Sequence, residues 1–427
     1  MGVKKVENVL DVRIAVFNDI GMRQRYLTKA VKEICFPTHK MGFISGPRQC
    51  GKTTLVKMFL DERSAGAYWN WDDVEFRRQW IKTPSMIVPK TSSGKIPLVA
   101  LDEIHKEHRW KRTLKGIYDT RKEPCDILVT GSARLNVYRK GTDSLLGRYF
   151  PFRLHPFSLR EMKTPQALCP EKTMAAIFEH GSPQGGKHSE YLKQLMIYGP
   201  FPEPLIGQNE KQARLWRKTR RELVIREDLR DISHIPELSR IELMVALLPE
   251  RVGSLFSVNA MREDLEVGFD TVKRWLTYLK ELYYLYEIKP WHRSIPRALK
   301  KEGKIYFWDF SEVQDYAARF ENLVANHLLK ACHFWTDTGE GIFDLFYVRN
   351  KEKKEIDFLI VKDGAPWLPV EVKLSDTNPS PNWRILLPLL SCKRGLQVVE
   401  APGRCLHRIN GFEVLVAGAE DILSLFV

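Results

Sequence analysis

The chain has 427 residues, of which 44% are hydrophobic and 11% aromatic, so it is long and apolar enough for two or three packed domains. Its 67 basic and 53 acidic residues give a charge of +14, which favours polyanionic partners such as DNA, although many soluble proteins carry this charge without binding nucleic acid. The lack of any run of eighteen apolar residues argues against a membrane segment, and seven scattered cysteines without a CxxC pair predict reduced thiols in the cytoplasm.

From Lys40 to about Phe157, short apolar runs alternate with helical patterns, which predicts a parallel sheet covered by helices. The segment 46–53 fits GxxxxGK[ST] between a strand and a helix, so we expect its backbone amides and Lys52 to hold the phosphates of ATP and Thr53 to bind Mg²⁺. The alternative is a glycine turn with a chance Lys-Thr, which the flanking elements disfavour. The expected nucleotide-binding residues are Gly46, Pro47, Gln49, Cys50, Gly51, Lys52, Thr53 and Thr54.

A second apolar strand ends in Asp102 and Glu103, the form of a Walker B strand. We expect Asp102 to hold Mg²⁺ through water and Glu103 to act as general base. After the next strand, Ser132, or Thr130 beside it, is expected to sense the γ-phosphate; the alternative is a helix cap. Arg148 is a candidate arginine finger given to a neighbouring subunit, or else a salt-bridge partner.

The following region is helical apart from a glycine-rich loop at 181–190. Four basic residues recur there at helical spacing, so one helix face is cationic and is either solvated or lines a nucleic-acid channel. They are Lys211, Arg214, Lys218 and Arg221.

Between Ser257 and Trp308 the pattern indicates a short helix, a longer helix and a β-hairpin, the order of a winged helix-turn-helix. The longer helix places Lys273, Arg274, Thr277 and Lys280 off its apolar face, as in a recognition helix. The alternative is a winged helix that only packs domains together.

The last region holds two apolar strands joined by the turn 362–364. Glu371 and Lys373 share one face of the second strand, and Asp357 lies on the first. This D…ExK pattern is that of PD-(D/E)XK nucleases, in which carboxylates hold Mg²⁺ and a lysine positions the attacking water. Glu321, on a preceding helix, is a further expected metal ligand beside Asp357 and Glu371. By itself, ExK also occurs by chance in lysine-rich chains.

Several stretches, "SGPRQCGKTTL", "LDEIHK", "LLGRYFPFRLHPFSLREM" and "YGPFPEPL" among them, together resemble a widespread bacterial and archaeal group of AAA-type ATPases. Their C-terminal domain, of unknown function, is similar to the PD-(D/E)XK nuclease fold. The resemblance covers most of residues 20–375, with "GSARL" in place of the commoner run of serines. It implies ATP binding, hydrolysis and assembly into homo-oligomers.

The expected fold class is α/β, with four parts: a P-loop ATPase core with a lead-in helix at 1–160, a helical lid or linker at 161–240, a winged helix at 241–310, and a PD-(D/E)XK nuclease-like α/β domain at 311–427. We expect a cytoplasmic ATP- and Mg²⁺-dependent enzyme that acts on DNA. The alternatives are a regulatory ATPase whose nuclease-like domain binds a partner without cutting it, and a C-terminal domain that only sets oligomer geometry.

Overall fold

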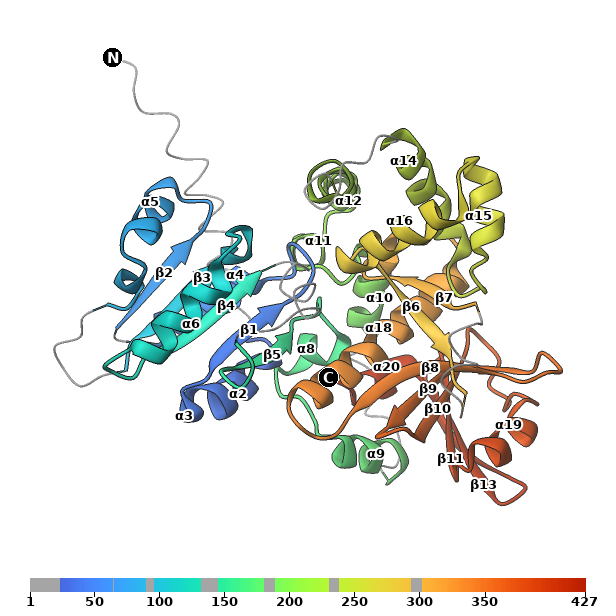
Figure 1. Ribbon diagram of the computed structural model, residues 1–427. Helices are drawn as coiled ribbons and strands as arrows, with labels where there is room; N and C mark the ends of the chain where they lie inside the picture. The colour runs from blue at the N-terminus through green and yellow to red at the C-terminus, as the bar shows by residue number, and fades with distance from the viewer. Residues whose placement is uncertain are drawn as a thin grey trace, which may run out of the picture.

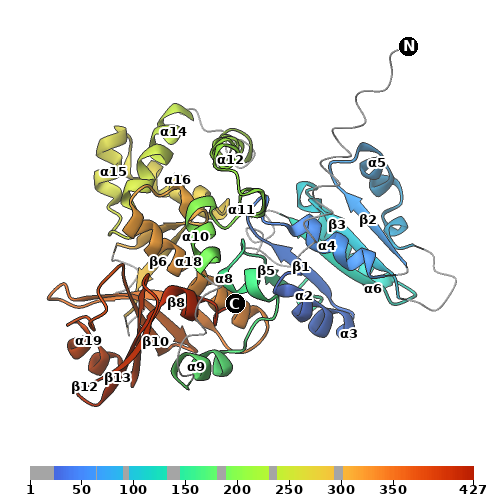
Figure 2. The same ribbon diagram turned by 180° about the vertical axis from the view of Figure 1, so that it is seen from behind.

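The computed structural model describes residues 24–63, 65–89, 96–131, 145–179, 189–229, 238–292 and 302–427. Two sheets organise these residues, one of five strands and one of eight. Figure 1 shows the smaller sheet at the left in blue and cyan and the larger one at the right in orange and red, with helices between and above them. The view from behind in Figure 2 shows the same division. Across the described ranges, no helix is both long and apolar enough to cross a membrane.

The first sheet is built from five parallel strands. These are β1 (Met41–Ser45), β2 (Gly66–Asn70), β3 (Leu98–Asp102), β4 (Asp126–Gly131) and β5 (Tyr149–Arg153). They lie in the order β2-β3-β4-β1-β5, so β1 has β4 on one side and β5 on the other. Strands β1, β3 and β4 are buried along their whole length, as expected of a parallel sheet with helices on both faces. The parallel sheet expected for the N-terminal part is confirmed.

Helices cover both faces of this sheet. Leu55 and Phe59 of one helix share a core with Ile44 of β1, whereas Trp80 and Trp110 of two others share a core with Phe43 on the opposite face. The helices are α2 (Leu27–Ala30), η1 (Val31–Cys35), α3 (Phe36–Thr38), α4 (Lys52–Asp61), α5 (Val74–Lys82), η2 (Pro84–Ile87), η3 (Ile104–Lys106) and α6 (Trp110–Thr120).

A set of helices follows in the chain. Most of them lie between and above the two sheets in Figure 1, whereas α9 lies near the bottom of that view. These are α8 (Leu159–Lys163), α9 (Pro170–Glu179), α10 (Ser189–Tyr198), α11 (Pro202–Gly207), α12 (Glu210–Leu223), η4 (Val224–Asp228), α14 (Leu238–Leu247), η5 (Leu248–Arg251), α15 (Val258–Leu265) and α16 (Phe269–Glu281). α12 runs without a break into η4, because Leu223 and Val224 both keep helical backbone angles.

The second sheet has the order β12-β13-β11-β10-β9-β8-β6-β7. Its strands are β6 (Leu285–Pro290), β7 (Lys304–Phe307), β8 (Phe343–Arg349), β9 (Glu355–Lys362), β10 (Ala365–Lys373), β11 (Arg394–Val399), β12 (Arg404–Ile409) and β13 (Phe412–Gly418). The helices of this part are η6 (Phe310–Glu312), α18 (Tyr316–Asp337), α19 (Trp383–Leu390) and α20 (Ala419–Leu423). α18 and α19 share cores with alternate residues of β9, which places them on opposite faces of the sheet.

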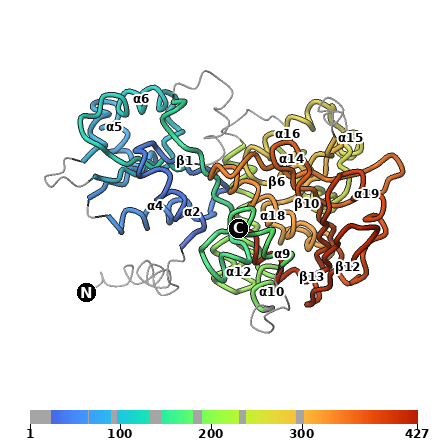
Figure 3. Tube along the Cα trace, turned by 90° about the horizontal axis from the view of Figure 1, so that it is seen from below, coloured from blue at the N-terminus to red at the C-terminus, as the bar shows by residue number. Residues whose placement is uncertain are grey.

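The second sheet crosses the boundary expected at residue 310. The predicted helices and hairpin of the winged helix occur as α15, α16 and the antiparallel pair β6–β7, but β6 also pairs in parallel with β8. The hairpin therefore forms one sheet with the C-terminal strands, and the residues of the expected wing at 293–301 lie outside the described part. Seen from below in Figure 3, the C-terminus lies near the centre of the molecule.

Candidate functional site

The predicted nucleotide-binding loop runs from the end of β1 to the start of α4. A Cβ atom added to Gly46 would lie 2.2 Å from the carbonyl oxygen of Leu154, so no larger residue fits there without moving the backbone. Gly51 has a φ of 97° and Gln49 a φ of 61°, both in the left-handed region. These conformations curl the loop in front of the N-terminus of a ten-residue helix, the arrangement in which backbone amides bind anions.

Lys52 and Thr53 lie next to the acid that ends β3. The buried Lys52 Nζ donates to the carbonyl oxygens of Gly46 (3.0 Å) and Pro47 (2.6 Å). Thr53 Oγ1 donates to Asp102 Oδ2 at 2.6 Å. The structure therefore brings together the loop lysine, the loop hydroxyl and the carboxylate that the sequence places 49 residues downstream.

Asp102 also accepts hydrogen bonds from two neighbouring strands. Tyr68 Oη of β2 donates to Oδ2 at 2.7 Å, and Thr130 Oγ1 of β4 donates to Oδ1. Burial, together with the hydrogen bond to Asp102, raises the pKa of Tyr68. The sequence reasoning missed Tyr68, because the sequence does not show that β2 lies beside β3. Ser132 lies outside the described residues.

Glu103 follows Asp102 at the same edge of the sheet, with a left-handed φ of 55°. Its carboxylate lies 3.6 Å from His105 Nε2 and 3.7 Å from Lys106 Nζ. Burial raises the pKa of Glu103, an effect that Lys52 and Lys106 oppose. A carboxylate with a raised pKa accepts a proton more readily than an ordinary one, which suits a general base.

The side chains of the other loop residues point in different directions, and not all of them are available to a nucleotide. The Cys50 side chain is buried with Sγ 3.5 Å from the carbonyl oxygen of Leu154, so only its backbone is available to a ligand. Its carbonyl oxygen accepts a 2.6 Å hydrogen bond from Arg25 Nη1. Thr54 is exposed on the first turn of α4. Arg48 turns toward η4, where it pairs with Asp228 at 2.8 Å.

Arg148 lies at the opposite edge of the sheet from the loop. It precedes β5, whose first residue pairs with Met41, the first residue of β1, whereas the loop follows the last residue of β1. Five residues of strand, roughly 13 Å, separate the two edges. Arg148 makes a two-point ion pair with Asp119, at 2.7 and 3.0 Å. It therefore does not serve the loop of its own chain, and the salt-bridge alternative is observed.

The expected carboxylates of the C-terminal part lie on adjacent strands. The turn at Asp363 and Gly364 joins β9 and β10, and the pairing of Val370 with Phe358 places Asp357 beside Glu371. Asp357 Oδ2 accepts a hydrogen bond from the Val372 amide at 2.8 Å. Lys373 Nζ lies 2.8 Å from Glu371 Oε1. The predicted D…ExK register is therefore present in the structure.

A lysine that the sequence reasoning missed enters this acidic cluster. Lys304, the first residue of β7, is only 3% exposed. Its Nζ lies 2.6 Å from Glu355 Oε1, 3.7 Å from Glu321 Oε1 and 3.8 Å from Asp357 Oδ1. The side chain comes from the strand expected to form the wing, and it reaches the acids only because β6 and β7 join the C-terminal sheet.

The predicted metal ligands do not form a metal site in this arrangement. In the described ranges, no group of three His, Cys, Asp or Glu side chains is placed to hold a metal ion, and Glu321, Asp357 and Glu371 are among the residues described. The Lys304 ammonium is the cation beside Glu321 and Asp357. Burial, then the neighbouring Asp357, raises the pKa of Glu371 to about 8 and that of Glu321 to about 7. Glu371 Oε2 is buried without a hydrogen-bond partner.

Helix α18 links the two regions. Near its N-terminal end it carries Glu321, and nine residues later, roughly 14 Å along the helix, it carries Lys330. Lys330 Nζ contacts Glu161, and Glu161 Oε1 accepts from Arg25 Nε at 2.8 Å. Arg25 is the side chain that binds the Cys50 carbonyl of the loop. A buried ionic chain therefore runs from the nucleotide-binding loop to α18.

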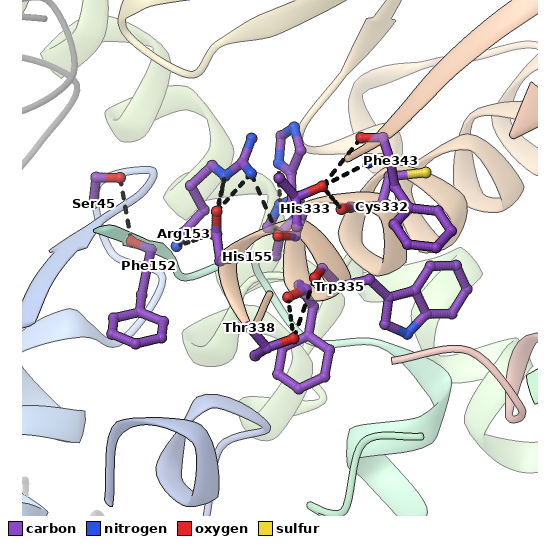
Figure 4. A network of polar contacts seen from close by, with 12 residues as sticks. Ser45, Phe152, Arg153, His155, Cys332, His333, Trp335, Thr338 and Phe343 are labelled. Carbon is purple, nitrogen blue, oxygen red and sulfur yellow. Dashed lines mark hydrogen bonds and ion pairs between the residues drawn. The ribbon is translucent and has the colours of Figure 1, made fainter. Parts of the chain in front are cut away.

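Two further contacts lie beside this chain. Arg153, at the end of β5, holds Asp337 of α18 with Nη2 2.6 Å from Oδ1. His155 Nε2 lies 2.8 Å from His333 Nδ1. Figure 4 shows Arg153 and His155 facing the segment of α18 that carries His333. The end of β5 and α18 are thus joined by several polar contacts within the described residues.

The parallel sheet, the glycine loop and the Thr53–Asp102 contact define a P-loop nucleotide-binding domain. Residues 38–163 match the family model described as AAA domain. Residues 38–163 are therefore similar to an AAA domain. Residues 189–318 and 316–405 match two further models, described as Domain of unknown function (DUF8612) and Domain of unknown function (DUF4143). The nuclease-like and winged-helix assignments stay predictions.

Similar proteins come from several organisms. An uncharacterized protein of Mycobacterium tuberculosis is 21% identical over 393 residues, 89% of this chain and 80% of its own length. One of Haemophilus influenzae is 22% identical over 428 residues, 92% of this chain and 96% of its own. Among solved structures, a Walker-type ATPase of Pyrococcus abyssi has 16% identity, covers 66% of this chain and 92% of its own, and gives a TM-score of 0.39. ORC1 of Aeropyrum pernix in complex with DNA has 15% identity, 70% and 91% coverage, and a TM-score of 0.29.

Proposed function

We propose that this protein hydrolyses ATP at the edge of its first sheet and uses the nucleotide to control its C-terminal part, which acts on DNA. The observation that carries the first part is the 2.6 Å hydrogen bond between Thr53 and Asp102, with Lys52 folded against the carbonyl oxygens of the same loop. The lysine can contact phosphate oxygens, and the hydroxyl and the carboxylate can bind Mg²⁺. All three groups lie beside the N-terminus of α4, so together they can bind a Mg²⁺–nucleotide.

Each residue of the loop has a proposed task. Lys52 would exchange the carbonyl oxygens of Gly46 and Pro47 for phosphate oxygens. Thr53 and Asp102 would hold Mg²⁺, which when bound supplies charge neutralisation for the phosphate oxygens. Glu103 would take the proton of the attacking water, and Tyr68 and Thr130 keep Asp102 in position.

Two residues complete the proposal. Ser132 would sense the γ-phosphate. Arg148 would act only on the nucleotide of a neighbouring subunit in a homo-oligomer, since it lies at the far edge of its own sheet and would have to leave Asp119.

Phosphate release at increasing Mg²⁺ concentration tests this function. Thr53→Ala and Asp102→Asn are expected to lower kcat roughly tenfold or more, which corresponds to about 1.4 kcal/mol or more of transition-state stabilisation. Asp61→Asn is the matched control, because Asp61 is exposed at the other end of α4. Equal Mg²⁺-dependent turnover by Asp102→Asn and the wild type would contradict the proposal.

Control of the C-terminal part is proposed to run through α18. The side chains of Arg25, Glu161 and Lys330, which connect the Cys50 carbonyl to α18, are buried and closely packed. A movement of the loop backbone on nucleotide binding would therefore displace these side chains and, through Lys330, α18. The same helix holds Glu321 in the acidic cluster.

Cleavage of DNA is the second candidate function, and the register of Asp357 with Glu371 and Lys373 favours it. Because the Lys304 ammonium lies beside Glu321 and Asp357, the cluster in this arrangement does not fit a metal ion. Incubation with several forms of DNA and Mg²⁺ or Mn²⁺, beside Glu371→Ala and Lys373→Ala, decides the matter. If the wild type cuts DNA and both substitutions abolish the cutting, the protein is a nuclease. If the wild type does not cut DNA, the result supports the regulatory ATPase.

A further inference from the structure

A basic cleft lies apart from both sites. It has a volume of about 260 Å³ and is bounded by α12, the end of α10, η6 and the beginning of α18. Of the described residues, five basic side chains line it, against a single acid, Glu312. The basic residues are Arg214, Arg217, Lys218, Arg221 and Arg319.

The acid does not neutralise this cleft. Glu312 is buried and lies 3.5 Å from Arg220, which is also buried and is not among the residues that line the cleft. Glu312 also accepts from Tyr284 Oη at 2.6 Å and pairs with Arg221 at 3.2 Å. Because the charge of Glu312 is already shared with Arg220, the lining keeps an excess of positive charge.

Two of the arginines that line the cleft are held by neutral acceptors. Arg217 donates to Ser311 Oγ at 3.1 Å, and Arg319 donates to the carbonyl oxygens of Val313 and Met196 at 2.7 and 3.2 Å. Burial, then the charge of Arg217, lowers the pKa of Arg319. Two like charges that line the same cleft and are held by uncharged partners repel each other, and an anion bound between them would relieve this repulsion.

The basic residues also continue along the helix. Lys211, Arg214, Lys218 and Arg221 span eleven residues of α12, a row roughly 15 Å long. A row of this length suits a linear polyanion better than a single ion. Among the residues that the structure describes, no aromatic side chain lines the cleft, so these residues offer contacts to phosphates and no surface on which bases stack.

We propose that this cleft binds the sugar–phosphate backbone of a nucleic acid without reading its sequence. The inference rests on the proposed function only in taking DNA as the partner. α12, which lines the cleft, continues into η4, and Asp228 of η4 pairs with Arg48 of the nucleotide-binding loop. A nucleic acid bound in the cleft would therefore contact a helix that is itself in contact with the loop.

Fluorescence anisotropy of labelled single-stranded and duplex DNA, in EDTA and without ATP, tests the inference independently of hydrolysis and cleavage. The wild type is expected to bind both forms, with log K falling against log salt at a slope of about −2.8 for single-stranded DNA and about −3.6 for duplex DNA, for about four phosphate contacts. The double substitution Arg214→Glu, Lys218→Glu is expected to weaken binding at least tenfold and to flatten the slope. A slope near zero for the wild type would overturn the proposal.

Two other double substitutions carry the same change in charge. Lys29→Glu, Arg78→Glu alters exposed residues of α2 and α5 and is expected to change affinity less than twofold. Lys273→Glu, Arg274→Glu alters the predicted recognition helix α16. Loss of binding in the α16 variant but not in the cleft variant would overturn the proposal. Displacement of DNA by polyglutamate of equal total charge would also overturn it, because the cleft would then be assigned to an acidic polypeptide.

If the cleft variant loses affinity, its melting temperature and circular dichroism are compared with those of the wild type. Arg214 is 63% exposed, so the folded state is expected to be retained. A second, uncharged variant, Arg214→Gln, Lys218→Gln, is expected to show about half the effect on the salt slope if phosphate contacts are responsible. Normal binding by both folded variants would overturn the proposal.

Discussion

Replacing Glu161 by glutamine is expected to weaken the contact between the nucleotide-binding loop and α18. The carboxylate side chain is 1% exposed and lies between Arg25 and Lys330. Glutamine keeps the shape but removes the charge, so two buried cations lose their common partner. Although burial opposes ionisation, Arg25 and Lys330 outweigh it and hold the pKa of Glu161 at about 2.

The size of the effect follows from that pKa. The difference from the ordinary value of 4.5 corresponds to about 3 kcal/mol of unfolding free energy at neutral pH. This agrees with the roughly 3–5 kcal/mol lost when one partner of a buried ion pair is removed. With an unfolding entropy of about 2 cal/mol/K per residue, the melting temperature of a chain of this length would fall by about 4 °C.

The pH dependence gives the sign of the effect. A carboxylate whose pKa is lower in the folded state stabilises fully above pH 4.5 and loses this contribution as the pH falls toward 2. The difference between the wild type and Glu161→Gln is therefore expected to be constant from pH 6 to 7 and to shrink by about 1 kcal/mol at pH 4.

Thermal unfolding at these pH values is the assay. Glu33→Gln is the matched control, because Glu33 is 63% exposed in its pair with Lys29 and is expected to change the melting temperature by less than about 1 °C. A melting temperature for Glu161→Gln within 1 °C of the wild type at pH 7 would refute the reasoning.

Gly46→Ala places a Cβ 2.2 Å from the Leu154 carbonyl oxygen and is expected to weaken binding of a fluorescent ATP analogue at least tenfold, whereas Gly116→Ala, with open space around its Cβ, is expected to leave it unchanged. Lys304→Met leaves Glu321, Glu355 and Asp357 without their buried cation, so the melting temperature at pH 7 is expected to fall by at least about 3 °C. Lys289 is exposed, so Lys289→Met is expected to leave the melting temperature unchanged. An equal fall for both variants would contradict the account. Arg148→Ala and Lys52→Ala are each expected to be inactive as ATPases and to regain part of the activity when mixed, if Arg148 serves a neighbouring subunit; no recovery on mixing would contradict that role.

The nucleotide-binding part was predictable from the sequence because its signals are local. The glycines of the loop and Lys52 lie within a few residues of one another, and the apolar strand before Asp102 shows where it ends. The register of Asp357 and Glu371 was also accessible, since a short turn joins their strands. In each case the geometry depends on residues close in sequence or on the fixed alternation of a strand.

The contacts that were missed join segments far apart in the chain. Tyr68 reaches Asp102 only because β2 lies beside β3, and Arg148 meets Asp119 only through the packing of α6 near β5. Lys304 reads as a surface lysine at the start of an apolar run. Its burial depends on the parallel pairing of β6 with β8, which no local pattern encodes.

The most direct test of the central claim is to measure nucleotide binding and turnover together in Glu103→Gln. If Glu103 is the base and the loop holds the nucleotide, this variant should bind Mg²⁺–ATP with an affinity within about threefold of the wild type, while kcat falls by about 10² to 10⁴. Turnover by Glu103→Gln at the wild-type rate, with binding unchanged, would contradict the proposed hydrolysis at this edge of the sheet.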